Sequence, residues 1–224
     1  MRRLVILRPE PGATATVESA KAIGLDTLAM PLFGVEPIKW QAPEASGFDG
    51  LLLTSANALR HGGDQLIRLR GLRAYTVGEA TAEAARAAGF DIASMGEAGV
   101  ERLLGSIDGD LKLLHLCGEH RTAVEARQAI TALPVYRSVA LPAPANFADV
   151  AGQTIAVHSP RAAQRLAEVA DEAKVERSAI RIAAISRSAA SAAGPGWEAC
   201  EAAESSSDRA LLSLAARLCD YCQP

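Results

Sequence analysis

The sequence predicts an α/β protein of two similar domains, each built on a parallel β-sheet with helices packed against it. Short apolar runs alternate with Ala-rich stretches of helical length along all 224 residues, a pattern typical of successive strand–helix units. One strand–turn–helix segment occurs twice, at residues 52–58 and 156–162. Two extended, proline-marked segments enclose the middle of the chain, which indicates that the chain leaves one domain, builds another and returns.

The first domain is expected to begin with a strand at residues 3–7, a helix at 14–23 and a second strand at 25–30. Gly24 stands where this helix ends, since glycine adopts the left-handed conformation at little cost. From Pro31 the chain runs extended past several prolines, because proline fixes φ and restricts the residue before it.

The alternation of strands and helices continues to the end of the chain. In the middle we expect strands at 50–54, 73–77, 91–95 and 111–116. They alternate with helices that begin at Ala56 and Gly99 and with helices at 80–88 and 121–130. Beyond a second extended segment, strands are expected at 154–158, 181–185 and 198–203, with helices at 161–170, 187–193 and 207–220.

These elements define the predicted domains. Residues 1–33 and 142–224 form a discontinuous α/β domain, and residues 41–135 form an α/β domain inserted into it. Residues 34–40 and 136–141 form paired linker strands that carry the chain out and back.

Composition excludes several classes of function. The formal net charge of −3 argues against a nucleic-acid-binding protein, which usually has a basic surface. No run of eighteen apolar residues is long enough to span a membrane, and the apolar stretch near the N-terminus is too short for a signal peptide, so we expect a cytoplasmic protein. The four His have no metal-ligand spacing, and no nucleophile elbow, Walker loop or dinucleotide fingerprint occurs, so we expect neither a metal nor a cofactor.

The internal repeat points to the binding site. Residues 52–58 parallel 156–162, and residues 74–81 parallel 182–189 in the same order and at similar spacing, which favours a duplication. Each repeat carries Ser or Thr where a strand passes into a helix, and such turns lie at the carboxyl edge of a doubly wound sheet. There the unpaired N–H groups and the positive end of the helix dipole can bind an anion, although the same hydroxyl groups often only cap the helix.

The chain resembles the uroporphyrinogen-III synthase family along nearly its whole length. The matching stretches are Leu7-Arg8-Pro9, residues 54–58, residues 77–81, Arg121, residues 135–137, residues 159–163 and Ile185 with the helix after it. The resemblance implies two flavodoxin-like domains with parallel sheets, a two-stranded linker and an active site in the inter-domain cleft. It departs from the family at 186–189, where Ser-Arg-Ser-Ala replaces the usual Gly and Thr.

The resemblance also implies the chemistry. The family cyclises hydroxymethylbilane to uroporphyrinogen III, inverts ring D and releases water, without a cofactor, in tetrapyrrole and heme biosynthesis. The substrate has eight carboxylates, which suits turns rich in hydrogen-bond donors. We expect a monomer, and a hand-over from hydroxymethylbilane synthase is left open.

Tyr136 is the candidate catalytic residue, because a phenol can donate a proton to the departing hydroxyl group. It can equally be a tyrosine that packs the linker. Glu79 either stabilises the azafulvene cation formed as water leaves or only complements its helix dipole, and the two arginines at 8 and 161 either bind carboxylates or are solvated. The candidate substrate-binding residues are Arg8, Thr54, Ser55, Asn57, Gly78, Glu79, Thr81, Arg121, Ser159, Arg161, Ser186 and Ser188.

Two other functions fit the same architecture. One is a non-catalytic two-domain module that binds a polyanionic small molecule. The other is an enzyme acting on a phosphorylated sugar, which would want a carboxylate pair or a Gly-rich phosphate loop, and neither stands out.

Overall fold

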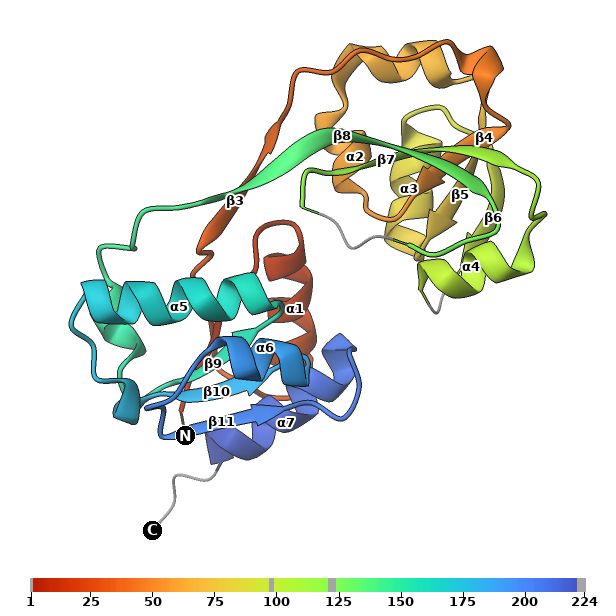
Figure 1. Ribbon diagram of the computed structural model, residues 1–224. Coiled ribbons are helices and arrows are strands. Elements are labelled where there is room, and N and C mark those ends of the chain that lie inside the picture. The colour runs from red at the N-terminus through yellow and green to blue at the C-terminus, as the bar shows by residue number, and fades with distance from the viewer. Residues whose placement is uncertain (1, 97–98, 121–123, 221–224) are drawn as a thin grey trace. The chain divides into compact units, whose positions relative to one another are not determined.

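The computed structural model describes residues 2–96, 99–120 and 124–220 of the chain. The chain divides into two compact units. Unit 1 comprises Met1–Gly34 and Val139–Pro224, and unit 2 comprises Val35–Ser138. Both are α/β structures (Figure 1), and the predicted α/β fold with parallel sheets is confirmed.

Unit 1 contains a five-stranded sheet in the order β11-β10-β9-β1-β2, with every neighbouring pair parallel. Its strands are β1 (Leu4–Ile6), β2 (Thr27–Ala29), β9 (Thr154–Val157), β10 (Arg181–Ala184) and β11 (Ala199–Ala202). Numbered along this unit, the order is 2-1-3-4-5, which is the order of flavodoxin-like folds.

Helices cover both faces of this sheet. They are α1 (Gly12–Ala22), α5 (Pro160–Glu172), α6 (Arg187–Ala192) and α7 (Asp208–Asp220). Because side chains alternate along a strand, Val5 packs with residues of α5 and α6, whereas Leu4 and Ile6 pack with residues of α1 and α7. The two faces therefore have separate apolar cores.

Unit 2 contains β4 (Gly50–Leu53), β5 (Arg73–Val77), β6 (Ile92–Gly96), β7 (Lys112–Gly118) and β8 (Ala129–Ala140). With β3 (Phe33–Pro37) they form a sheet in the order β3-β8-β7-β4-β5-β6. One face packs against α2 (Asn57–His61), the 3-10 helix Gly63–Leu69 and α3 (Glu79–Ala87), and the other packs against α4 (Val100–Ser106).

β3 and β8 connect the two units. Ile38 donates its N–H to the carbonyl of Val135, and Leu141 donates to Leu32, so the two segments run antiparallel. The boundaries between the units fall within these segments, which include the residues expected to be linker strands, 34–40 and 136–141.

The two sheets match when their strands are paired by position. β9, β10 and β11 of unit 1 take the places of β4, β5 and β6 of unit 2, and β1 and β2 take those of β7 and β8. The sequence repeat makes the same pairing, since residues 52–58 and 156–162 follow β4 and β9. The two sheets thus arrange five corresponding strands in the same order, and β3 is an added edge strand in the sheet of unit 2.

One predicted element is wrong. A helix was expected at 121–130, but residues 124–128 form no helix and β8 already begins at Ala129; residues 121–123 lie outside the described residues. The buried Gln128 donates its side-chain amide to the carbonyl of Leu104, within α4, and to that of Asp108, just after α4 ends. Gln128 is thus held against the end of α4, and from Ala129 the backbone pairs with β7 instead of forming a helix.

None of the helices in the described part of the chain is long and apolar enough to cross a membrane.

Candidate functional site

Each sheet has a switch point, where the winding of the chain reverses. In unit 1 it lies between β1 and β9, because β1 is followed by β2 on one side and β9 by β10 on the other. In unit 2 it lies between β7 and β4 for the same reason. In open α/β sheets ligands bind outside the carboxyl ends of the strands at this point. The two switch points are therefore the candidate binding positions of this chain.

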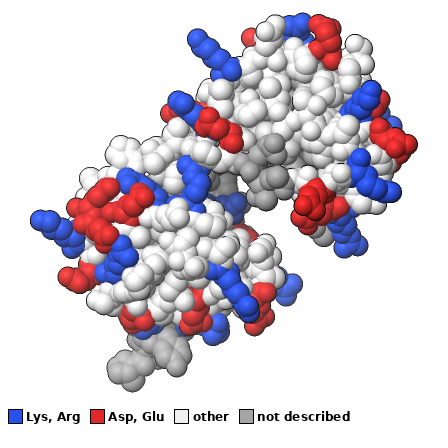
Figure 2. Space-filling model, viewed as in Figure 1, with Lys and Arg blue, Asp and Glu red and all other residues white. Residues whose placement is uncertain are grey.

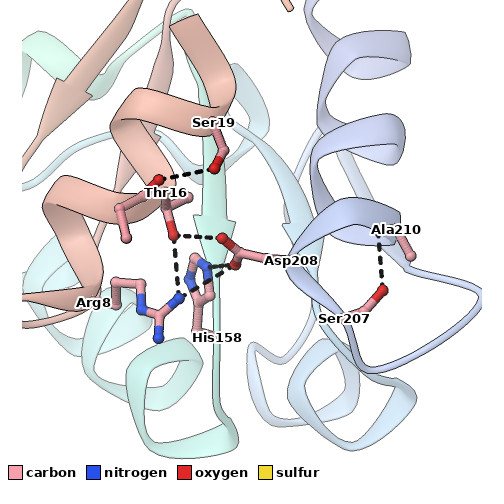
Figure 3. Close-up of polar contacts among 8 residues, drawn as sticks. Arg8, Thr16, Ser19, His158, Ser207, Asp208 and Ala210 are labelled. Carbon is pink, nitrogen blue, oxygen red and sulfur yellow. Dashed lines mark hydrogen bonds and ion pairs between the residues drawn. The ribbon is translucent and has the colours of Figure 1, made fainter. Parts of the chain in front are cut away.

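Four polar side chains meet at the switch point of unit 1: Arg8 after β1, Thr16 of α1, His158 after β9 and Asp208 at the start of α7 (Figure 3). We call them the Asp208 network. The Asp208 carboxylate accepts from Nη1 of Arg8 at 3.3 Å, from Nε2 of His158 at 3.0 Å and from Oγ1 of Thr16 at 2.8 Å. Four elements distant in sequence are therefore tied to one carboxylate.

The network lowers the pKa of Asp208. Burial opposes the charge of Asp208, but the hydrogen bonds from His158 and Thr16, with the positive charges of His158 and Arg8, outweigh it and hold the pKa of Asp208 below its ordinary value. A carboxylate only accepts hydrogen bonds, so the proton of His158 that faces it is on Nε2. Nδ1 of His158 is buried and has no hydrogen-bond partner among the described residues.

The turns after β9 and β10 are capped helix starts. Ser159 accepts a hydrogen bond from the N–H of Ala162, and Ser186 accepts one from Ala189. Ser188 lies 2.9 Å from the Ser186 hydroxyl group. Ser159 and Ser186 each use an oxygen lone pair on their own helix. Ser159 keeps an O–H that can donate to a ligand, whereas one of the two O–H groups of Ser186 and Ser188 is used between them.

In unit 2 the turn after β4 is also internally bonded. Thr54 Oγ1 lies 3.0 Å from Nε2 of His115, a buried residue of β7, and this bond spans the switch point. Ser55 accepts from the N–H of Asn57, whose side-chain oxygen in turn accepts from Arg60 at 3.5 Å.

The turn after β5 has a different backbone from its counterpart after β10. Gly78 has φ +79°, in the left-handed region that favours glycine, whereas Ser186 has φ −156°, which any residue adopts. Glu79 forms an exposed ion pair with Arg86 at 2.8 Å, and Thr81 is buried. The two turns of this chain thus differ in backbone geometry, and Ser186 needs no glycine conformation.

Tyr136 lies beside the carboxyl end of β7. Its β8 backbone is in register with Gly118, and a Cβ added at Gly118 would lie 2.9–3.2 Å from the ring and hydroxyl oxygen of Tyr136. The ring therefore covers the bare backbone of Gly118, and it is tilted toward His61 with centroids 6.3 Å apart. Tyr136 is half-buried against the α2 face of unit 2, so it packs on the core and lies beside the carboxyl end of β7, one of the two strands that flank the switch point.

Comparison with known proteins places this arrangement in a family. A family model described as Uroporphyrinogen-III synthase HemD matches residues 14–212, which cover most of both units. The chain belongs to the uroporphyrinogen-III synthase family. A comparison with curated proteins finds no match.

Two solved structures share the fold. A uroporphyrinogen-III synthetase from Helicobacter pylori is 19% identical, with 97% of this chain and 100% of that chain covered and a TM-score of 0.63. A mutant uroporphyrinogen III synthase from the extremely thermophilic bacterium Thermus thermophilus is 18% identical, with 97% and 98% covered and a TM-score of 0.50. Uroporphyrinogen-III synthases with little sequence identity to this chain thus keep its architecture.

The structure brings most predicted site residues to the carboxyl edges of the two sheets. In unit 1 these are Arg8, Ser159, Arg161, Ser186 and Ser188, and in unit 2 they are Thr54, Ser55, Asn57, Gly78, Glu79, Thr81 and Tyr136. The guanidinium of Arg161 lies 4.8 Å from the ring centroid of Phe33, a cation–π contact. Arg121 lies outside the described residues.

Sequence reasoning missed Asp208 and Thr16. An acidic residue at the start of a helix usually only complements the helix dipole, and Thr16 lies in the middle of a helix, so neither stands out. The signal that was present is His158, a histidine directly after a buried strand.

The charges around these sites are mixed. Figure 2 shows Lys and Arg interspersed with Asp and Glu on the face in view, and several charged residues of the chain form ion pairs. Recognition of an anion at the switch points therefore depends on individual donors, not on a broad basic surface.

Proposed function

We propose that this protein cyclises hydroxymethylbilane to uroporphyrinogen III, inverting ring D and releasing water. The observation that carries the proposal is the family match across residues 14–212. The hydroxyl and N–H donors at the carboxyl edges of both sheets support it, since a substrate with eight carboxylates needs many such partners.

The chemical task is mainly one of positioning. The substrate closes without an enzyme to the uninverted isomer, so the protein must hold the two ends of the bilane where ring D can invert through a spiro intermediate. We propose that donors of both units bind carboxylates of one substrate molecule. Removing the hydroxyl group of one of the two capping serines should then weaken substrate binding only in part, because many donors share the binding.

Tyr136 is the proposed proton donor. The hydroxyl group of the substrate needs a proton to leave as water, and the position of the Tyr136 phenol beside Gly118, at the carboxyl end of β7, supports this role. Water departs with that proton, and the azafulvene cation remains. Ring D attacks the cation through its substituted α-carbon to form the spiro intermediate. The bond from that carbon to the neighbouring methylene bridge then breaks, and the bridge bonds to the free α-carbon, which closes the macrocycle with ring D inverted. The proton lost when the new bond forms can return to the phenolate.

The proposal extends to the location of the protein, its oligomeric state, its cofactor requirement and the source of its substrate. We infer a cytoplasmic monomer without a cofactor, which takes its substrate from hydroxymethylbilane synthase.

An isomer analysis tests the function. The purified chain is incubated with porphobilinogen and hydroxymethylbilane synthase, and the oxidised porphyrins are separated by chromatography. We expect the type III isomer to dominate. Type I alone would refute the proposal, and if the chain then still bound the bilane, the non-catalytic binding module would replace it.

A further inference from the structure

The Asp208 network has a second anchor, which is the backbone at the start of α1. A Cβ added at Gly12 would lie 2.4 Å from Nε of Arg8, 2.7 Å from its Cζ and 2.8 Å from its Nη2. The guanidinium therefore lies directly on the bare Cα of Gly12, in space that any other side chain would fill. The guanidinium of Arg8 can approach the backbone this closely because Gly12 has no side chain.

The hydrogen bonds of Arg8 use only one side of its guanidinium. Nη1 donates to Thr16 at 3.1 Å and to Asp208 at 3.3 Å, and among the described residues neither Nε nor Nη2 has a hydrogen-bond partner. Figure 3 shows Nη1 turned toward the network and another nitrogen turned away from it. Nε and Nη2 together form the edge with which arginine binds a carboxylate in bidentate fashion.

Asp208 is held more firmly than an ordinary surface carboxylate. Its partner Thr16 is fully buried, the side chain of His158 is 8% exposed, and both donate to it. Asp208 itself is the first residue of α7, where Ser207 caps the helix by accepting from Ala210. The carboxylate thus has a fixed position toward which Arg8 is drawn.

We propose that Asp208 is a positioning residue for substrate binding: it holds Nη1 of Arg8 so that the Nε–Nη2 edge faces a substrate carboxylate at the switch point of unit 1. The inference rests on the proposed function. The alternative is that Asp208 competes with the substrate carboxylate for Arg8, which would neutralise Arg8 and weaken anion binding. The unused bidentate edge argues for positioning, because the competitor would be expected to occupy that edge itself.

Steady-state kinetics of four variants test this role. Asp208→Asn removes the charge, Arg8→Gln removes the bidentate edge, and the double variant asks whether the two act together. Gly12→Ala keeps every side chain of the network and displaces Arg8 by the contact described above. The matched control is Asp26→Asn, which breaks an Arg–Asp pair (2.9 Å to Arg3) at the opposite, amino end of β1.

We expect Asp208→Asn, Arg8→Gln and Gly12→Ala each to raise KM about tenfold with kcat changed by less than about twofold, since a charge-assisted bidentate contact is lost. The double variant should be no worse than Arg8→Gln alone. Asp26→Asn should have the wild-type KM. An unchanged or lower KM in Asp208→Asn, or effects that multiply in the double variant, would overturn the positioning role.

A spectroscopic measurement separates this inference from the proposed function. The Nε–Hε signal of Arg8 in a ¹⁵N-labelled sample is assigned by its loss in Arg8→Gln. It should shift in Asp208→Asn and in Gly12→Ala but not in Asp26→Asn. A signal that stays in place refutes positioning whatever the activity, whereas a shift in a chain that makes only type I product leaves positioning standing and removes the function.

Discussion

Replacing Ser159 with aspartate separates the two roles of a serine cap. Ser159 begins α5 and accepts the N–H of Ala162 at 3.1 Å. Aspartate caps a helix as well as serine does and favours the positive end of its dipole, so Ser159→Asp should leave the stability of the fold unchanged. The same change places a negative charge where a substrate carboxylate is expected.

The size of the effect follows from electrostatics. Two unit charges about 5 Å apart in a medium of effective dielectric constant ~40 repel each other by about 1.7 kcal/mol, which corresponds to a rise in KM of about 15-fold. Ser159→Ala is the matched comparison. It removes the cap, costs about 1 kcal/mol of unfolding free energy and lowers Tm by about 2–4 °C, but it adds no charge.

Thermal unfolding and steady-state kinetics on the two variants decide the matter. The expected pattern is a wild-type Tm with a raised KM for Ser159→Asp, and a lowered Tm with a nearly normal KM for Ser159→Ala. A wild-type KM in Ser159→Asp would show that no substrate carboxylate approaches this turn, and the reasoning from helix starts to carboxylate binding would be wrong.

Three further predictions concern other parts of the molecule. Tyr136→Phe should lower kcat with little change in KM, and an unchanged kcat would remove the hydroxyl group from the mechanism. The pKa of Asp208 is lowered in the folded protein, so its contribution to stability is complete above the ordinary aspartate pKa and is lost as pH falls through the lowered value. The Tm of Asp208→Asn should therefore fall less steeply than that of the wild type as the solution is made acidic. Parallel curves of Tm against pH would contradict this. Glu198→Ala should lower the free energy of unfolding, measured by chemical denaturation, by about 2–4 kcal/mol, because it leaves the buried Arg181 without its ion-pair partner. Glu201→Ala breaks an exposed ion pair and should lower it by less than about 1 kcal/mol. Equal losses would refute the argument from burial.

Most of the fold was predictable because its signals are local. Apolar runs and helix-ending glycines such as Gly24 and Gly89 mark the strand–helix units, and the repeat shows that the units are duplicated. The order of the strands within each sheet was not predictable, since hydrophobic patterns do not say which strands pair. The helix expected at 121–130 failed for a similar reason: the contacts of Gln128 with α4 are made far along the chain.

The site was predictable only in part. Ser159 and Ser186 cap helices, and a cap can be recognised from the residue type and its place after a strand. Asp208 is distant in sequence from both Arg8 and His158, and only the folding of the sheet brings them together. Networks of this kind depend on tertiary structure, so their members do not stand out in a sequence.

Titration of the ¹⁵N-labelled chain with uroporphyrinogen III tests the central claim most directly, because backbone amide signals report on every helix start at once. The account predicts that amides of residues 55–58 and 79–82 of unit 2 and of 160–163 and 187–190 of unit 1 shift together with one binding constant. Uroporphyrinogen I serves as the comparison and should bind more weakly. Shifts confined to one unit, or to the amino ends of the strands, would contradict the claim that both switch points bind the tetrapyrrole.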